Sequence, residues 1–252
     1  MKYFLKGSLF FLLIVVIVFS FSCGKTDGKE TLKVGTNAEY PPFEYKEGTE
    51  FKGIDMDLAK LLAEKMNMKL EILDMDFDSL IPSLGANKID LAMAAITITD
   101  ERREKVDFSI PYYSVDQAII CKKEKNINIE SEEELANYQI GVQNGTTGQI
   151  YIDKNLVKPG KMPQDNFNKY ATNIEAITDM LNGNIDLVII DSSAGKGYKS
   201  MKPIKIIYTI ETGEEYGIGM PKNSPLKEKV NNHLKNILDS QEWNKILQEY
   251  IK

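Results

Sequence analysis

The sequence is poor in the side chains that enzymes most often use for nucleophilic and metal chemistry. Its 252 residues include only two cysteines and one histidine. The histidine, His233, lies in the C-terminal region, and neither cysteine has a plausible general base beside it. No group of histidine, cysteine and carboxylate residues has the spacing of a metal site. We therefore expect no metal, no cofactor and no catalytic residues.

An excess of positive charge is also missing. The chain contains 31 lysine and arginine residues against 37 aspartate and glutamate residues, a formal net charge of −6 at pH 7. A protein that binds nucleic acid needs clustered positive charge to neutralise the phosphates, and the sequence contains no such cluster. We expect no nucleic acid partner.

The sequence has one long apolar run, and it predicts export. Lys2 and Lys6 precede an uncharged run at residues 7–24 that is dense in Phe, Leu, Ile and Val. A basic segment, an apolar segment and then small residues are typical of a secretory signal peptide, which we place at residues 1–22. The run is long enough that an uncleaved transmembrane anchor is an alternative.

The end of this run resembles a bacterial lipoprotein signal. Cys23 follows the apolar run and precedes a polar stretch, as the lipidated cysteine of such proteins does. Ser20 stands where leucine is usual, a departure that bears on the cleavage site and not on export. The resemblance implies a lipid anchor at Cys23, a flexible tether at residues 23–30, and a folded part in the periplasm or at the cell surface. Cys121 lies in an apolar run and is expected to be a buried core thiol.

From residue 31 onward, short apolar segments alternate with amphipathic ones. Strands are predicted at 32–35, 69–73 and 89–95, and helices at 54–66 and 77–86, where apolar residues recur at helical spacing. This βαβαβ order predicts a parallel sheet with helices on its faces.

The second half of the chain follows a similar plan. A strand at 139–142 leads into a Gly/Thr-rich turn at 144–148, and the helix–turn–strand pattern at 175–190 resembles that at 78–93. Such units recur in many α/β proteins, which is one interpretation; the other is two similar lobes with a ligand cleft between them. The polar stretch 122–134 is predicted to be the loop that leads into the second lobe.

Several motifs then follow one another in a fixed order along the chain. They are Tyr40-Pro41-Pro42-Phe43, Gly53-Ile54-Asp55-Met56-Asp57-Leu58-Ala59, Met75-Asp76-Phe77, Ile96-Thr97-Ile98-Thr99-Asp100-Glu101-Arg102, Val106-Asp107-Phe108-Ser109 and Gly141-Val142-Gln143-Asn144-Gly145-Thr146-Thr147-Gly148. With these motifs, nearly all of residues 31–252 resembles family 3 of the extracellular solute-binding proteins, the polar amino acid-binding components of ABC importers.

The resemblance implies a two-lobed α/β fold of the type II periplasmic-binding-protein kind. Each lobe would be a mixed, mostly parallel sheet flanked by helices, and two crossing segments would join the lobes. Lobe 1 would comprise residues 31–112 and 217–252, and lobe 2 residues 117–211. The hinge would lie near 112–116 and 212–216.

The resemblance also implies a division of labour among site residues. Arg102 would bind the α-carboxylate of a free amino acid through a planar two-pronged contact. Ala95, Thr97 and Thr147 would complete the carboxylate site through backbone N–H or hydroxyl groups. Asp191, from the other lobe, would bind the α-ammonium.

The side chain of the ligand would meet four further residues. Tyr40 and Phe77 would sandwich it, and Asn37 and Gln143 would contact its far end. Plainer interpretations exist: Tyr40 and Phe77 also fit an ordinary core, and Asn37 fits the turn after its strand. Arg102 also fits a solvated charge at a helix start, and Asp191 a helix N-cap.

The sequence offers conflicting indications about which amino acid binds. Asn37 stands where some members of the family carry aspartate, and the loss of that charge argues against a strictly basic ligand. The run Gln143–Gln149 instead resembles arginine- and lysine-type members. Glu39 and Glu44 are expected at the solvated surface, although Glu39 is near enough in sequence to face a cationic ligand end. We therefore predict the class, a polar or basic amino acid, and not the ligand.

The expected mechanism is hinge closure. Arg102 and Asp191 would lie on opposite lobes, so only the closed state would bind both ends of a zwitterion. The closed protein, a monomer anchored to the membrane, would then dock on an ABC permease with its ATPase. Alternatives are a component that feeds a sensor or chemoreceptor, and a small-carboxylate dehydratase on the same fold.

Overall fold

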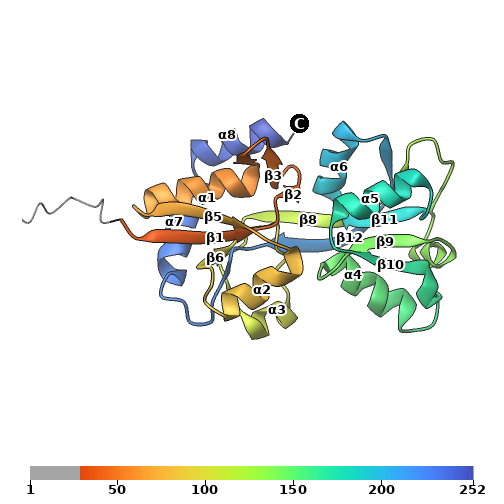
Figure 1. Cartoon of the computed structure of the whole chain (residues 1–252), viewed down its shortest axis with the longest axis horizontal. Coiled ribbons are helices and arrows are strands. Elements are labelled where there is room, and N and C mark those ends of the chain that lie inside the picture. The colour runs from red at the N-terminus through yellow and green to blue at the C-terminus, as the bar shows by residue number, and fades with distance from the viewer. Residues whose placement is uncertain (1–28, 252) are drawn as a thin grey trace, which may run out of the picture.

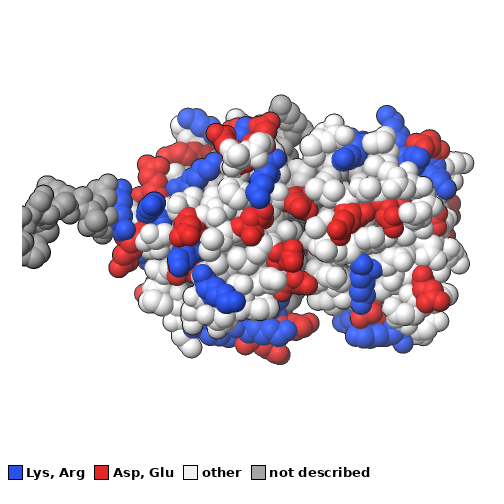
Figure 2. Space-filling model, in the orientation of Figure 1, with Lys and Arg blue, Asp and Glu red and all other residues white. Residues whose placement is uncertain are grey.

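Residues 29–251 are described by a computed structural model, in which two α/β lobes lie side by side (Figure 1). The predicted signal peptide, Cys23 and most of the predicted tether lie outside the described residues. None of the helices within 29–251 is long and apolar enough to cross a membrane. Acidic and basic side chains are interspersed over the visible face of both lobes (Figure 2).

The first lobe is built on a five-stranded sheet in the order β5-β1-β6-β13-β7. β1 (Thr31–Thr36) pairs in parallel with β5 (Lys69–Asp74) and with β6 (Leu91–Ala92). β13 (Gly219–Met220) returns from the second lobe and pairs antiparallel with β6 and with β7 (Asp107–Phe108). The predicted strands are present, although β6 is shorter than predicted.

Five helices cover this sheet. They are α1 (Ile54–Lys65), α2 (Phe77–Gly85), α3 (Asp100–Lys105), α7 (Lys227–Leu238) and α8 (Gln241–Tyr250). α1 turns its apolar stripe inward, so that Leu58 and Leu62 are fully buried, as expected for apolar residues at helical spacing.

A small antiparallel sheet follows β1 and reaches the boundary between the lobes. Its strands are β2 (Glu39–Tyr40), β3 (Glu44–Glu47) and β4 (Glu50–Lys52). Phe43, just before β3, is fully buried in the core of the first lobe. This anchors the segment that carries Tyr40.

The second lobe has its own five-stranded sheet, in the order β10-β9-β11-β8-β12. The strands are β10 (Phe167–Tyr170), β9 (Ile140–Gln143), β11 (Leu187–Asp191), β8 (Tyr113–Lys122) and β12 (Ile204–Tyr216). The first three are parallel, and β8 pairs antiparallel with β11 and β12.

Three α-helices flank this second sheet. α4 (Thr147–Ile152) continues into a wider helical turn (Asp153–Val157), and α5 (Asn173–Asn182) and α6 (Ser192–Met201) follow. Short 3-10 turns lie at Glu132–Asn137 and Gln164–Asn166.

One prediction about the chain path is wrong. Residues 122–134 do not lead into the second lobe, because β8, which precedes them, already belongs to the second sheet. The chain enters the second lobe along β8 itself, and the polar stretch lies within that lobe.

The two predicted crossing segments lie side by side at the centre of the molecule (Figure 1). β8 and β12 pair there through Tyr113 with Tyr216 and Val115 with Glu214. The register shifts between Ile210 and Glu214, and such irregularities bend strands locally. The boundaries of the hinge stay a prediction.

Candidate functional site

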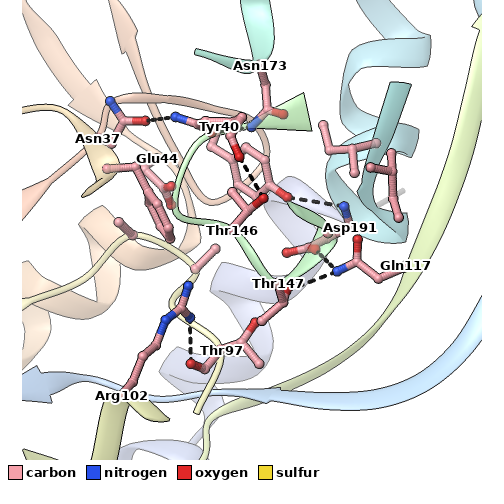
Figure 3. A pocket seen from close by; sticks show the side chains of 17 residues that line it. Asn37, Tyr40, Glu44, Thr97, Arg102, Gln117, Thr146, Thr147, Asn173 and Asp191 are labelled. Atoms are coloured by element: carbon pink, nitrogen blue, oxygen red, sulfur yellow. Dashed lines mark hydrogen bonds between the residues drawn. The ribbon is translucent and has the colours of Figure 1, made fainter. Parts of the chain in front are cut away.

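All nine predicted ligand-binding residues line one pocket between the lobes (Figure 3). The first lobe contributes Asn37, Tyr40, Phe77, Ala95, Thr97 and Arg102, and the second contributes Gln143, Thr147 and Asp191. They come from segments that follow strands of the two sheets, where open α/β sheets bind ligands.

Arg102 is a buried cation on the first lobe. It lies in the first turns of α3, where the Thr99 hydroxyl caps the helix by accepting the Arg102 backbone N–H at 3.1 Å. Its guanidinium donates to the carbonyl oxygens of Thr97 at 2.7 Å and Gly145 at 2.9 Å, and lies 5.5 Å from the centre of the Phe77 ring. No carboxylate within residues 29–251 approaches the Arg102 guanidinium to 4.0 Å, and burial lowers the pKa of Arg102.

Asp191 is a buried carboxylate on the second lobe, at the junction of β11 and α6. It accepts hydrogen bonds from Gln117 Nε2 and the Tyr216 hydroxyl, and its backbone N–H donates to the Tyr40 hydroxyl oxygen at 3.3 Å. Burial, followed by the nearby charge of Glu214, raises the pKa of Asp191 to about 6. The pocket thus has a buried cation at one side and a buried carboxylate at the other.

The backbone at Ala95 and Thr97 shapes the pocket wall. Ala95 has a positive φ of 49°, and its N–H donates to buried Asp55 at 2.8 Å. This N–H, predicted to serve an α-carboxylate, is therefore already used. Thr97 faces Tyr216 of β12 in an antiparallel bridge. The hydrogen bonds of this bridge are made by its neighbours, from Ile98 N–H to the Glu215 carbonyl at 2.8 Å and from Gly217 N–H to the Ile96 carbonyl at 3.0 Å. The N–H and C=O of Thr97 itself therefore point away from β12.

Two amides close the far end of the pocket. Gln143 Nε2 donates across the lobes to Asn37 Oδ1 at 3.0 Å, and Asn37 Nδ2 donates to the Met75 carbonyl at 3.1 Å. Gln143 also donates to the Ala171 carbonyl at 3.1 Å and accepts from Asn173 Nδ2. The predicted pair therefore meets in the structure, as part of a larger amide network.

Sequence reasoning missed Glu44, which also lines the pocket. The expectation that Glu44 is at the surface is wrong: its side chain is 1% exposed, and its Oε2 has no hydrogen-bond partner among the described residues. Burial, with Asp55 nearby, raises the pKa of Glu44 well above its ordinary value. Strand alternation gives no signal for it, because Glu44 directly follows buried Phe43. Glu39 is half-buried and lies outside the pocket lining.

Gln117 was also missed, as were Thr146 and Asn173. Gln117 lies on β8, is fully buried, and points its amide nitrogen at Asp191. Its position directly before the apolar run that contains Cys121 is the one sequence signal that could have identified it, because a polar residue buried with such a run needs a partner.

Residues 32–252 match the model of the bacterial extracellular solute-binding proteins, family 3. The arginine-binding extracellular protein ArtP of Bacillus subtilis is 34% identical over 235 residues, which cover 92% of this chain and 90% of that protein.

Solved structures share both fold and sequence. An ancestral arginine-binding protein bound to arginine superposes with a TM-score of 0.82 at 37% identity, covering 89% of this chain and 99% of that one. An ancestral arginine-binding protein bound to glutamine has a TM-score of 0.81, also at 37% identity, with 88% and 98% covered. The ancestral amino acid-binding protein AncCDT-1, a precursor of cyclohexadienyl dehydratase, has a TM-score of 0.80 at 33% identity, with 88% and 96% covered. The predicted two-lobed α/β fold is thereby confirmed.

Proposed function

The chain belongs to the bacterial extracellular solute-binding proteins of family 3, and on that basis we propose that it binds a free L-amino acid with a cationic side chain. In this proposal the protein delivers the amino acid to an ABC permease and its ATPase. L-Arginine is the first ligand to test, because similar proteins carry that ligand in their names.

The observation that carries the proposal is the pair of buried charges on opposite lobes. Arg102 lacks an anionic partner within 4.0 Å among residues 29–251, and Asp191 has only neutral donors around it. A buried charge is costly unless it is paired. The carboxylate and ammonium of an amino acid supply both missing partners at once.

Glu44 supports a cationic side chain. A zwitterion alone would balance Arg102 and Asp191, and the buried Glu44 carboxyl would keep its raised pKa and an oxygen without a hydrogen-bond partner. A guanidinium or ammonium on the ligand's side chain balances it and satisfies its unpartnered oxygen. In this proposal Glu44 supplies the negative charge that Asn37, standing where some members of the family carry aspartate, does not provide.

The aromatic residues are oriented by the same charged groups. Phe77 lies against the Arg102 guanidinium, and the Tyr40 hydroxyl accepts the Asp191 N–H. In the proposal both rings contact the ligand's side chain, which gains from stacking and from cation–π attraction.

We infer that binding proceeds by closure of the lobes about the paired strands at 112–116 and 212–216. An open state would expose Arg102 and Asp191 separately, and the ligand would favour the closed state by contacting both. The lipid anchor at Cys23 is likewise a proposal, supported by the basic and apolar N-terminal sequence, and would hold the protein near its permease.

Calorimetric titration of the purified protein against the twenty L-amino acids tests the proposal. We expect L-arginine, L-lysine or L-histidine to bind most tightly, and to raise the melting temperature by mass action, about 2.7 kcal/mol of stabilisation at a hundredfold excess over the dissociation constant. Binding of none of the twenty would contradict the proposed function.

A charge variant tests the role of Glu44 separately. Glu44→Gln should lower the ratio of L-arginine to L-glutamine affinity, because the side-chain cation loses its counter-charge. Glu50→Gln, on the same small sheet but exposed, is the matched control and should leave that ratio unchanged.

A further inference from the structure

Glu214 connects the two lobes beside the ligand pocket. It lies on β12, and its Oε2 accepts the hydroxyl protons of Thr97 at 2.8 Å and of Thr147 at 2.7 Å. Thr97 precedes α3 in the first lobe, and Thr147 is the first residue of α4 in the second. Both threonines line the pocket, whereas Glu214 lines only the open groove behind them.

This arrangement decides what the two hydroxyls can offer a ligand. A threonine hydroxyl has one proton and two acceptor lone pairs. Since both protons point at Glu214, the oxygens of Thr97 and Thr147 can only accept a hydrogen bond from inside the pocket. The Thr97 hydroxyl therefore cannot donate to an α-carboxylate in this arrangement, which differs from the role that the sequence predicted for it.

The same network reaches the carboxylate of Asp191. Gln117 Nε2 donates to Asp191, and lies 3.3 Å from Glu214 Oε1 and 3.3 Å from Thr147 Oγ1. Acceptor oxygens of Asp191, Thr97 and Thr147 are thus held together by shared partners. A group that carries several N–H donors and a positive charge fits this set.

We propose that Glu214 is a positioning residue for recognition of the ligand's α-ammonium: by taking both hydroxyl protons, it presents two threonine oxygens, one from each lobe, as acceptors. The proposal rests on the proposed function, since the ammonium belongs to an amino acid. Because the two threonines come from different lobes, the acceptor set is complete only when the lobes are closed.

Three probes separate this role from a general structural one. L-Arginine carries both α-groups, agmatine lacks the α-carboxylate, and 5-guanidinopentanoate lacks the α-ammonium. Glu214→Ala should weaken L-arginine and agmatine on the order of tenfold, the usual scale of hydrogen bonds to charged groups. It should leave 5-guanidinopentanoate unchanged or tighter, because the freed hydroxyls can donate to its carboxylate.

Two further variants serve as controls. Glu214→Gln keeps one acceptor oxygen, which both hydroxyls can share, and should retain more L-arginine affinity than Glu214→Ala. Glu215→Ala removes an equal charge from the exposed neighbouring position and should leave all three affinities near wild type.

The outcomes are distinguishable by titration calorimetry. An equal loss for all three probes, or no loss for L-arginine, would overturn the positioning role while leaving amino acid binding intact. A wild-type protein that binds none of the probes would overturn the proposed function and this inference together.

Discussion

Arg102 shows how a single residue can imply a ligand. The residue is 8% exposed, and the partners described for its guanidinium are two backbone carbonyl oxygens and the Phe77 ring. These neutral partners hold the guanidinium in place without neutralising it. The charge therefore gains most from an anion that enters the pocket.

Replacement of Arg102 by alanine should weaken L-arginine binding by about 3–5 kcal/mol, because the ligand carboxylate would be buried without its cation. Titration calorimetry measures this loss. Arg103→Ala, at the exposed neighbouring position, should bind as the wild type does. Unchanged affinity in Arg102→Ala would refute the site.

At the scale of elements, helix α6 lies against the backbone of the opposite lobe. A Cβ atom at Gly197 would lie 2.5 Å from the Pro41 carbonyl oxygen, a backbone atom of the first lobe. At Gly195, on the same helix, the nearest atoms to such a Cβ are Ile side chains at 3.5 Å or more. The contact between the lobes therefore requires glycine at position 197, whereas position 195 has room for a methyl group.

Gly197→Ala should change affinity and stability in opposite directions. Alanine favours a helix interior over glycine by about 1 kcal/mol, so the free energy of unfolding should rise in urea titrations of the ligand-free protein. Affinity for L-arginine should fall, because the methyl group blocks the closed arrangement. Gly195→Ala should raise stability and leave affinity unchanged; equal affinities for the two variants would contradict the argument.

At the scale of the whole molecule, buried carboxyl groups make stability depend on pH. Burial raises the pKa of Asp55 to about 7 and that of Asp191 to about 6, against about 3.9 for an unperturbed aspartate. Between pH 4 and 7 the folded protein therefore holds protons that the unfolded chain has released. By linkage, the free energy of unfolding falls as pH rises through this window.

Urea unfolding of the ligand-free protein at pH 5 and pH 7.5 should thus show lower stability at the higher pH. Asp55→Asn, whose amide oxygen can still accept the Ala95 N–H, should reduce the difference between the two pH values. Stability that rises from pH 5 to 7.5, or an undiminished difference in the variant, would show that these carboxyls are not the cause.

Local elements of this fold can be predicted from the sequence more fully than contacts between distant segments. Apolar spacing predicted β1, β5, β6, α1 and α2, because burial of one face leaves a local periodic pattern, but it did not predict the small sheet β2–β4. The placement of 122–134 failed, because composition does not reveal which lobe a polar loop belongs to. The pairing of β8 with β12 joins segments about a hundred residues apart, and no local pattern reports it.

The sequence by itself predicted the α/β alternation and carried the family resemblance, and that resemblance implied the nine residues that line one pocket; the export signal stays a prediction. Only the tertiary structure decided that Glu44 is buried there, that the Ala95 N–H is taken by Asp55, and that Glu214 directs the hydroxyls of Thr97 and Thr147. The physical reason is that each of these facts depends on which groups approach from distant segments. A hydrogen bond assigns a proton only when both partners are in place.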